Sequence, residues 1–108
     1  MQVLVIVGPV AEGDTGVDPI EIVKYFNWDL VPIVGDRLEE TLLVDGKEDI
    51  FTIGLVTIRY IHSNRFGTQD ATLQVKKSHE VGRDISVWRG NQWMTPSEFV
   101  DRFGSGIL

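Results

Sequence analysis

The order of apolar and polar residues divides the chain into several strand-like segments and two helix-like segments. Residues 2–7 form a continuous apolar run rich in β-branched residues, which predicts a strand buried on both faces or lying at the centre of a sheet. Further extended segments are predicted at residues 31–34, 37–44, 51–62, 71–76 and 85–87, which gives five or six strands in all.

Two local signals indicate how these strands connect and bend. Asp45-Gly46 stands between extended segments and predicts a β-hairpin. In the longest segment, the apolar phase of Phe51 and Ile53 shifts by one residue after Gly54 and continues through Tyr60. Such a shift at a glycine is typical of a β-bulge, which allows a small sheet to curl towards closure.

Capping signals predict two helices. Asp18, Pro19 and Glu21 have the spacing of an N-cap, a first-turn proline and a capping-box acid, and they predict a short helix over residues 18–27. A second capping box precedes a helix expected over residues 96–103. We therefore expect one α+β domain spanning the whole chain: a small, mostly antiparallel, half-open β-barrel with two short helices.

A longer pattern supports this architecture. Its parts are Val31-Pro32-Ile33-Val34-Gly35-Asp36-Arg37-Leu38, then Asp45-Gly46-Lys47, then Val56-Thr57-Ile58-Arg59-Tyr60-Ile61-His62-Ser63. The pattern resembles small SH3-like β-barrel proteins of bacteria and phages, whose roles are mostly unassigned. The resemblance covers residues 31–77, and it implies an SH3-like architecture and no particular activity.

Charge is distributed unevenly along the chain. Of a formal net charge of −6, residues 1–50 carry −8 and residues 51–108 carry +2. Each contact with a nucleic-acid phosphate or an anionic lipid needs a cation, so we expect neither nucleic acid nor membrane as a direct partner. The absence of cysteine excludes disulfides and thiolate catalysis. With no basic segment before its first apolar run, the chain is expected to be soluble and cytoplasmic.

The sequence contains only weak matches to phosphate-binding and metal-binding motifs. Gly8 and Gly13 have the spacing of a phosphate-binding loop, but Asp14 stands where that loop needs a lysine. Asp14, Asp18 and Glu21 could gather around a hard cation, although capping explains the last two better. We therefore predict no metal and no cofactor.

His62 continues the inward phase of Ile58 and Tyr60, so we expect it at the end of a core face. Its neighbour Ser63 would point to the opposite face, which excludes a catalytic triad built on the two. No catalytic residues are assigned.

Three groups of residues could contact a partner. Trp88 and Trp93 frame a predicted turn with Arg89 that could form an exposed anchor, since tryptophan and arginine are enriched at binding hot spots. The alternative is that Trp93 caps the barrel under the C-terminal helix and Trp88 fills the core. Arg59 and Lys76 fall on the outward phase of their strands and predict a basic strip. An acidic patch is expected around the Asp-Gly hairpin, from Asp36, Glu39, Asp45, Glu48 and Asp49.

These features favour a non-enzymatic interaction or assembly module, which binds a protein partner or its own copies through Trp88, Arg89 and Trp93. A second hypothesis is an acidic inhibitor that mimics nucleic acid and presents residues 36–49 to a DNA-binding enzyme. A third is a small enzyme that uses His62, Tyr60 and a carboxylate of the acidic half for acid–base catalysis.

Overall fold

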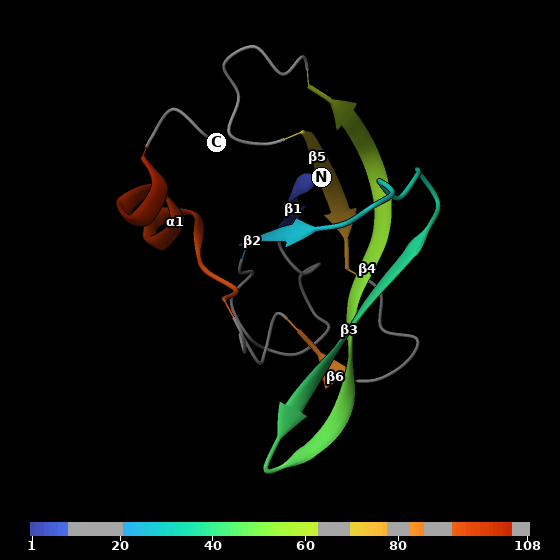
Figure 1. The fold of residues 1–108 in the computed structure, drawn as a ribbon, viewed down its shortest axis with the longest axis vertical. Helices are drawn as coiled ribbons and strands as arrows, with labels where there is room; N and C mark the ends of the chain where they lie inside the picture. Colours follow the sequence, from blue (N-terminus) through green and yellow to red (C-terminus); the bar gives the residue numbers. More distant parts are fainter. Residues whose placement is uncertain (9–20, 63–69, 78–82, 86–91, 105–108) are drawn as a thin grey trace.

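The computed structural model describes residues 1–8, 21–62, 70–77, 83–85 and 92–104. They form one mixed sheet, curled into a half-barrel, and a short helix (Figure 1). The strands lie in the order β2-β1-β5-β4-β3, and β6 pairs with β4 outside this path. The elements are β1 Gln2–Val7, β2 Ile22–Asn27, β3 Arg37–Val44, β4 Lys47–Ile61, β5 Ala71–Lys76, β6 Arg83–Asp84 and α1 Pro96–Phe103.

β1 lies in the middle of the sheet, antiparallel to β2 and parallel to β5. Val3, Val5 and Val7 belong to the core inside the curl, which we call the inner face. Leu4 and Ile6 belong to a second apolar cluster, on the outer face. The prediction of a strand buried on both faces is therefore confirmed. The sheet is mostly antiparallel, as predicted, because β1–β2, β3–β4 and β4–β5 pair in that sense. It is also mixed, since β1–β5 and β4–β6 pair in parallel.

The predicted helix over residues 18–27 is wrong for its described part, because Ile22–Asn27 form strand β2. Ile22, Val23 and Phe26 are compatible with a helix period and a strand period alike. Pairing with the whole length of β1 decides between them, since a strand rich in β-branched and aromatic residues fits a pleated, half-buried surface. Asp18 and Pro19, which carry the capping signal, lie outside the described residues.

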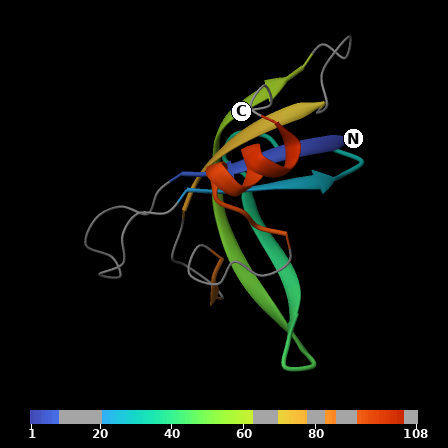
Figure 2. The same ribbon diagram turned by 90° about the vertical axis from the view of Figure 1, so that its left-hand side faces the viewer.

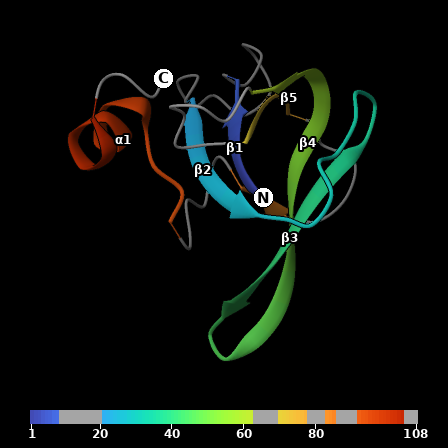
Figure 3. The same cartoon turned by 45° about the horizontal axis from the view of Figure 1, so that its top comes forward.

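β3 and β4 form a hairpin whose tip projects from the other strands (Figures 1 and 3). Val44 pairs with Lys47, so the connection is the two-residue loop Asp45-Gly46. Both loop residues have positive φ angles, 52° and 78°, as a type I′ turn requires. The hairpin predicted from Asp-Gly is confirmed.

β4 contains the bulge predicted at Gly54. Leu38 pairs with Gly54 but Glu39 pairs with Thr52, which leaves Ile53 as the extra residue of β4. At Gly54 φ is 144°, and a Cβ atom there would lie 2.2 Å from the backbone oxygen of Lys76. Only glycine permits β5 to approach β4 this closely.

A second register shift, which the sequence did not indicate, leaves Thr57 unpaired between Val56 and Ile58. This shift reverses the face of the sheet to which each later residue of β4 points. Ile58 and Tyr60, predicted to point inward, pair with Gln74 and Thr72 on the outer face, where they are 45% and 58% exposed.

The helix predicted at residues 96–103 is confirmed as α1, and it covers the outer face of β1 and β2 (Figure 2). The Thr95 hydroxyl accepts a hydrogen bond from the Glu98 amide at 3.3 Å, and Gly104 follows the last turn. Phe99 packs on Leu4, Ile6 and Val23. No helix within the described residues is long and apolar enough to cross a membrane.

The last short strand lies earlier than predicted. β6 is Arg83–Asp84, whereas Ile85 is a buried turn residue that packs in the inner core. Residues 86 and 87 lie outside the described part of the chain.

Candidate functional site

A polar cluster lies inside the half-barrel between β2 and β3, the two ends of the strand order. The Lys24 ammonium donates to Glu40 Oε1, and the Trp93 indole N–H donates to Glu40 Oε2 at 2.7 Å. Lys24 and Trp93 are only 6% and 4% exposed. Both carboxylate oxygens of Glu40 are engaged and shielded from solvent, and a satisfied buried network of this kind rigidifies a core.

The Lys24 ammonium also lies 4.6 Å from the ring centre of Phe26 and 5.8 Å from that of Trp93. A cation so placed is attracted by the negative faces of the rings. A buried ion pair contributes little beyond a well-packed apolar pair, but loss of one partner leaves a buried charge at a cost of about 3–5 kcal/mol. The cluster therefore fixes how β2 and β3 meet.

The backbone explains how Trp93 enters the barrel. Met94 exchanges two hydrogen bonds with Val23 on the free edge of β2, at 2.7 and 3.0 Å. Met94 consequently packs on the outer face beside Phe99, and the preceding Trp93 points to the inner face. Trp93 thus takes the core position, the alternative to an exposed anchor that the sequence also allowed. Trp88 and Arg89, its predicted companions, lie outside the described residues.

His62 and Tyr60 do not form the acid–base site considered from the sequence. His62 Nε2 lies 2.7 Å from the hydroxyl oxygen of Thr72, and the His62 amide donates to the carbonyl of Asp70 at 2.8 Å. The hairpin acids lie at the opposite end of β4 from His62, on the order of 40 Å away along the strand.

No group of three or more histidine, aspartate or glutamate side chains in the described part of the chain is placed to hold a metal ion. Glu21, a candidate ligand from the sequence, is exposed just before β2. The other residues of these motifs, Gly13, Asp14 and Asp18, lie outside the described residues.

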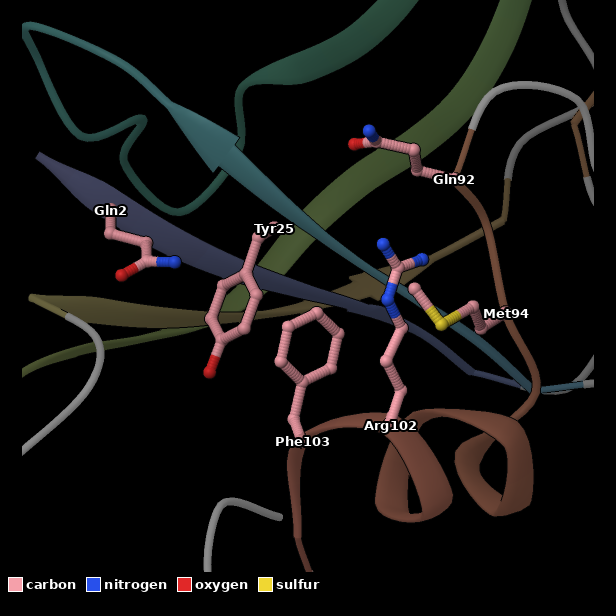
Figure 4. A pocket seen from close by; sticks show the side chains of 6 residues that line it. All are labelled: Gln2, Tyr25, Gln92, Met94, Arg102 and Phe103. Carbon is pink, nitrogen blue, oxygen red and sulfur yellow. The ribbon is translucent and has the colours of Figure 1, made fainter.

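A shallow pocket of about 180 Å³ lies between α1 and the outer face (Figure 4). Its lining is Gln2, Tyr25, Gln92, Met94, Arg102 and Phe103. The rings of Tyr25 and Phe103 meet edge to face at 5.4 Å, and the Arg102 side chain extends towards Met94. Ligand sites for small molecules usually enclose about 300–1,000 Å³, so this pocket is small for one.

The predicted charged patches are exposed but divided between faces. Arg59 pairs with Leu73 and lies on the inner face, where it is exposed. Lys76 pairs with Leu55 and lies on the outer face. The two cations therefore do not form one strip.

The acidic residues are divided in the same way. Glu39 and Glu48 lie on the outer face of the hairpin, opposite Thr52 and Leu43, while Asp49 pairs with the inner residue Leu42. Asp45 is in the turn, and the Asp36 carboxylate accepts from the Ile33 amide at 3.0 Å in the turn before β3.

The largest feature missed by sequence reasoning is apolar. Leu55, Ile58 and Tyr60 follow one another on the outer face of β4, and they are 40%, 45% and 58% exposed. We call these three residues the body patch. Two cations flank it in the row of Leu55, Arg37 on β3 and Lys76 on β5, and both are exposed.

The hairpin carries a second patch on the same outer face. Leu43 and Ile50 are 70% and 44% exposed. Leu43 pairs with Glu48, and Glu39 lies on the same face of β3, on the far side of Thr41 from Leu43. We call Leu43, Ile50, Glu39 and Glu48 the hairpin patch. The buried Thr52 separates it from the body patch.

Comparisons with protein-family models, with curated proteins and with solved structures gave no match. The resemblance to SH3-like barrels therefore stays a prediction.

Proposed function

We propose that this protein is a non-enzymatic interaction module that contacts a protein partner through the body patch of β4. The observation that supports the proposal is the placement of Leu55, Ile58 and Tyr60 on one face of one strand, all exposed. Exposed apolar side chains that are contiguous on one face, rather than scattered singly, are a feature of interaction sites.

The arrangement of the outer face supports the same function. α1 covers the half of that face formed by β1 and β2, whereas the half formed by β4 and β5 carries exposed apolar side chains. Tyr60 adds an aromatic ring with a polar end, a side chain enriched at binding hot spots. A sheet also presents these groups on a rigid backbone, which reduces the entropy lost on binding.

The two other hypotheses have less support. Mimicry of nucleic acid needs a row of carboxylates on one face, whereas Glu48 and Asp49 lie on opposite faces of the hairpin. Acid–base catalysis needs a carboxylate near His62, whose ring nitrogen meets the hydroxyl of Thr72 instead.

The test is recovery of bound proteins by the tagged protein in its native host, with every bound chain identified, including untagged copies of the bait. Ile58→Glu places a charge in the body patch and is expected to lower recovery of the main partner about tenfold or more. Leu30→Glu is the control, because Leu30 is 83% exposed and outside the patch. Equal recovery by folded wild type and folded Ile58→Glu would contradict the proposal.

A further inference from the structure

The body patch and the hairpin patch are opposite in charge and alike in apolar content. On the body patch, Leu55 stands between the cations Arg37 and Lys76 in one row across three strands. On the hairpin patch, Leu43 stands directly opposite the anion Glu48. Each patch has an apolar centre and charges of a single sign beside it.

We propose that the body patch binds the hairpin patch of a second copy of this chain, an inference that rests on the proposed function and names its partner. Leu43 and Ile50 of one copy pack against Leu55, Ile58 and Tyr60 of the other. Glu39 and Glu48 then face Arg37 and Lys76. The charges select this pairing, because two body patches or two hairpin patches would bring like charges together.

The shape of the chain supports a second copy as the occupant. The hairpin extends away from the other strands in all three ribbon views, so its outer face is accessible to another molecule (Figures 1, 2 and 3). Along β4, buried Thr52 and the bulge at Ile53 lie between the apolar residues of the two patches, whereas on β3 Arg37 and Glu39 are neighbours on the outer face. Each copy carries both partners of the contact, so two copies can exchange two such contacts.

The expected association is weak and depends on salt. The body patch with its two flanking cations offers five side chains and the hairpin patch offers four, whereas a standard interface uses about 20–30 residues on each side. The charges beside the apolar centres are exposed, so screening at high salt should weaken the contact. Apolar burial should still leave part of the affinity at high salt.

The experiment is sedimentation equilibrium of the wild-type chain at low and high sodium chloride, over concentrations from tens of micromolar to about 1 mM. We expect a mass of two or more chains at low salt, and a dissociation constant about tenfold higher or more at 1 M salt. Ile58→Glu and Leu43→Glu should each remain monomeric under the same conditions. A wild-type chain that stays monomeric at low salt would overturn the inference.

A charge exchange separates this contact from a general effect on the fold. Lys76→Glu and Glu48→Lys should each weaken association, and the chain carrying both changes should regain it, because the charges at positions 76 and 48 are then opposite again while Arg37 and Glu39 keep theirs. Asp101→Lys, an exposed site on α1, is the control and should leave association unchanged. Failure of the double variant to regain association would overturn the inference.

The two proposals can fail separately. If the wild-type chain is monomeric but Ile58→Glu still loses a different bound protein in the native host, the body patch serves a foreign partner and only the inference of a second copy is wrong. If the Ile58→Glu chain keeps both its recovered partner and its self-association, the proposed function and the inference of a second copy are both wrong.

Discussion

Lys24 on β2 and Glu40 on β3 form a buried ion pair, although their strands are the two ends of the sheet order. The pair joins those ends across the open side of the half-barrel. Trp93, from the segment before α1, fills the same gap and donates to the same carboxylate. Three distant parts of the sequence are thereby held together by one glutamate.

Glu40→Leu should destabilise the fold by about 3–5 kcal/mol, because it leaves the Lys24 ammonium buried without its counter-charge. Lys24→Met combined with Glu40→Leu should cost less than Glu40→Leu alone, since the uncompensated charge is gone. Urea unfolding of the four proteins of this cycle measures both values. A double variant less stable than either single variant would contradict this role of the pair.

Trp93→Phe keeps an aromatic ring in the barrel but removes the N–H that donates to Glu40. We expect a loss of about 1–3 kcal/mol in the free energy of unfolding, because a buried carboxylate oxygen loses its partner. The same change should cost less in the Glu40→Leu background, where no carboxylate remains. Equal costs in both backgrounds would show that Trp93 contributes by packing alone.

Gly54→Ala should destabilise the protein by about 3 kcal/mol or more, because the added Cβ would meet the backbone of β5 at 2.2 Å. Gly35→Ala is the matched control. Gly35 also has a positive φ, 97°, but its Cβ would meet no atom within 4 Å. Thermal unfolding should show the larger loss at Gly54, and equal losses would argue against the close approach of β5.

Thr95→Ala should reduce stability by about 1 kcal/mol, since the Glu98 amide at the start of α1 loses its acceptor. Thr95→Ser keeps a hydroxyl and should recover most of the loss. Chemical denaturation of the three proteins compares them, and a serine variant no more stable than the alanine variant would contradict the capping role.

Local signals predicted the elements that local chemistry determines. The apolar run of β1, the Asp-Gly turn and the capping box of α1 were all read correctly from neighbouring residues. The slip at Gly54 was also readable, because the apolar phase changes at a glycine.

Elements set by distant contacts were not predictable. β2 follows a helix-like capping signal, yet its pairing with β1 makes it a strand. Lys24 is in the core because it finds Glu40 there, 16 residues away in the sequence. The bulge at Thr57 involves no glycine, and it alone decides that Ile58 and Tyr60 point outward to form the body patch.

Chemical cross-linking tests the contact between the body patch and the hairpin patch most directly. The chain has no cysteine, so an introduced cysteine is its only thiol. Leu43→Cys and Ile58→Cys chains are mixed at low salt and treated with a short bis-maleimide, with Leu30→Cys as the exposed control. The account predicts a cross-linked dimer that forms faster in the mixture of Leu43→Cys with Ile58→Cys than in either chain alone, and that is suppressed by high salt. A yield no higher than that of Ile58→Cys mixed with Leu30→Cys would contradict it.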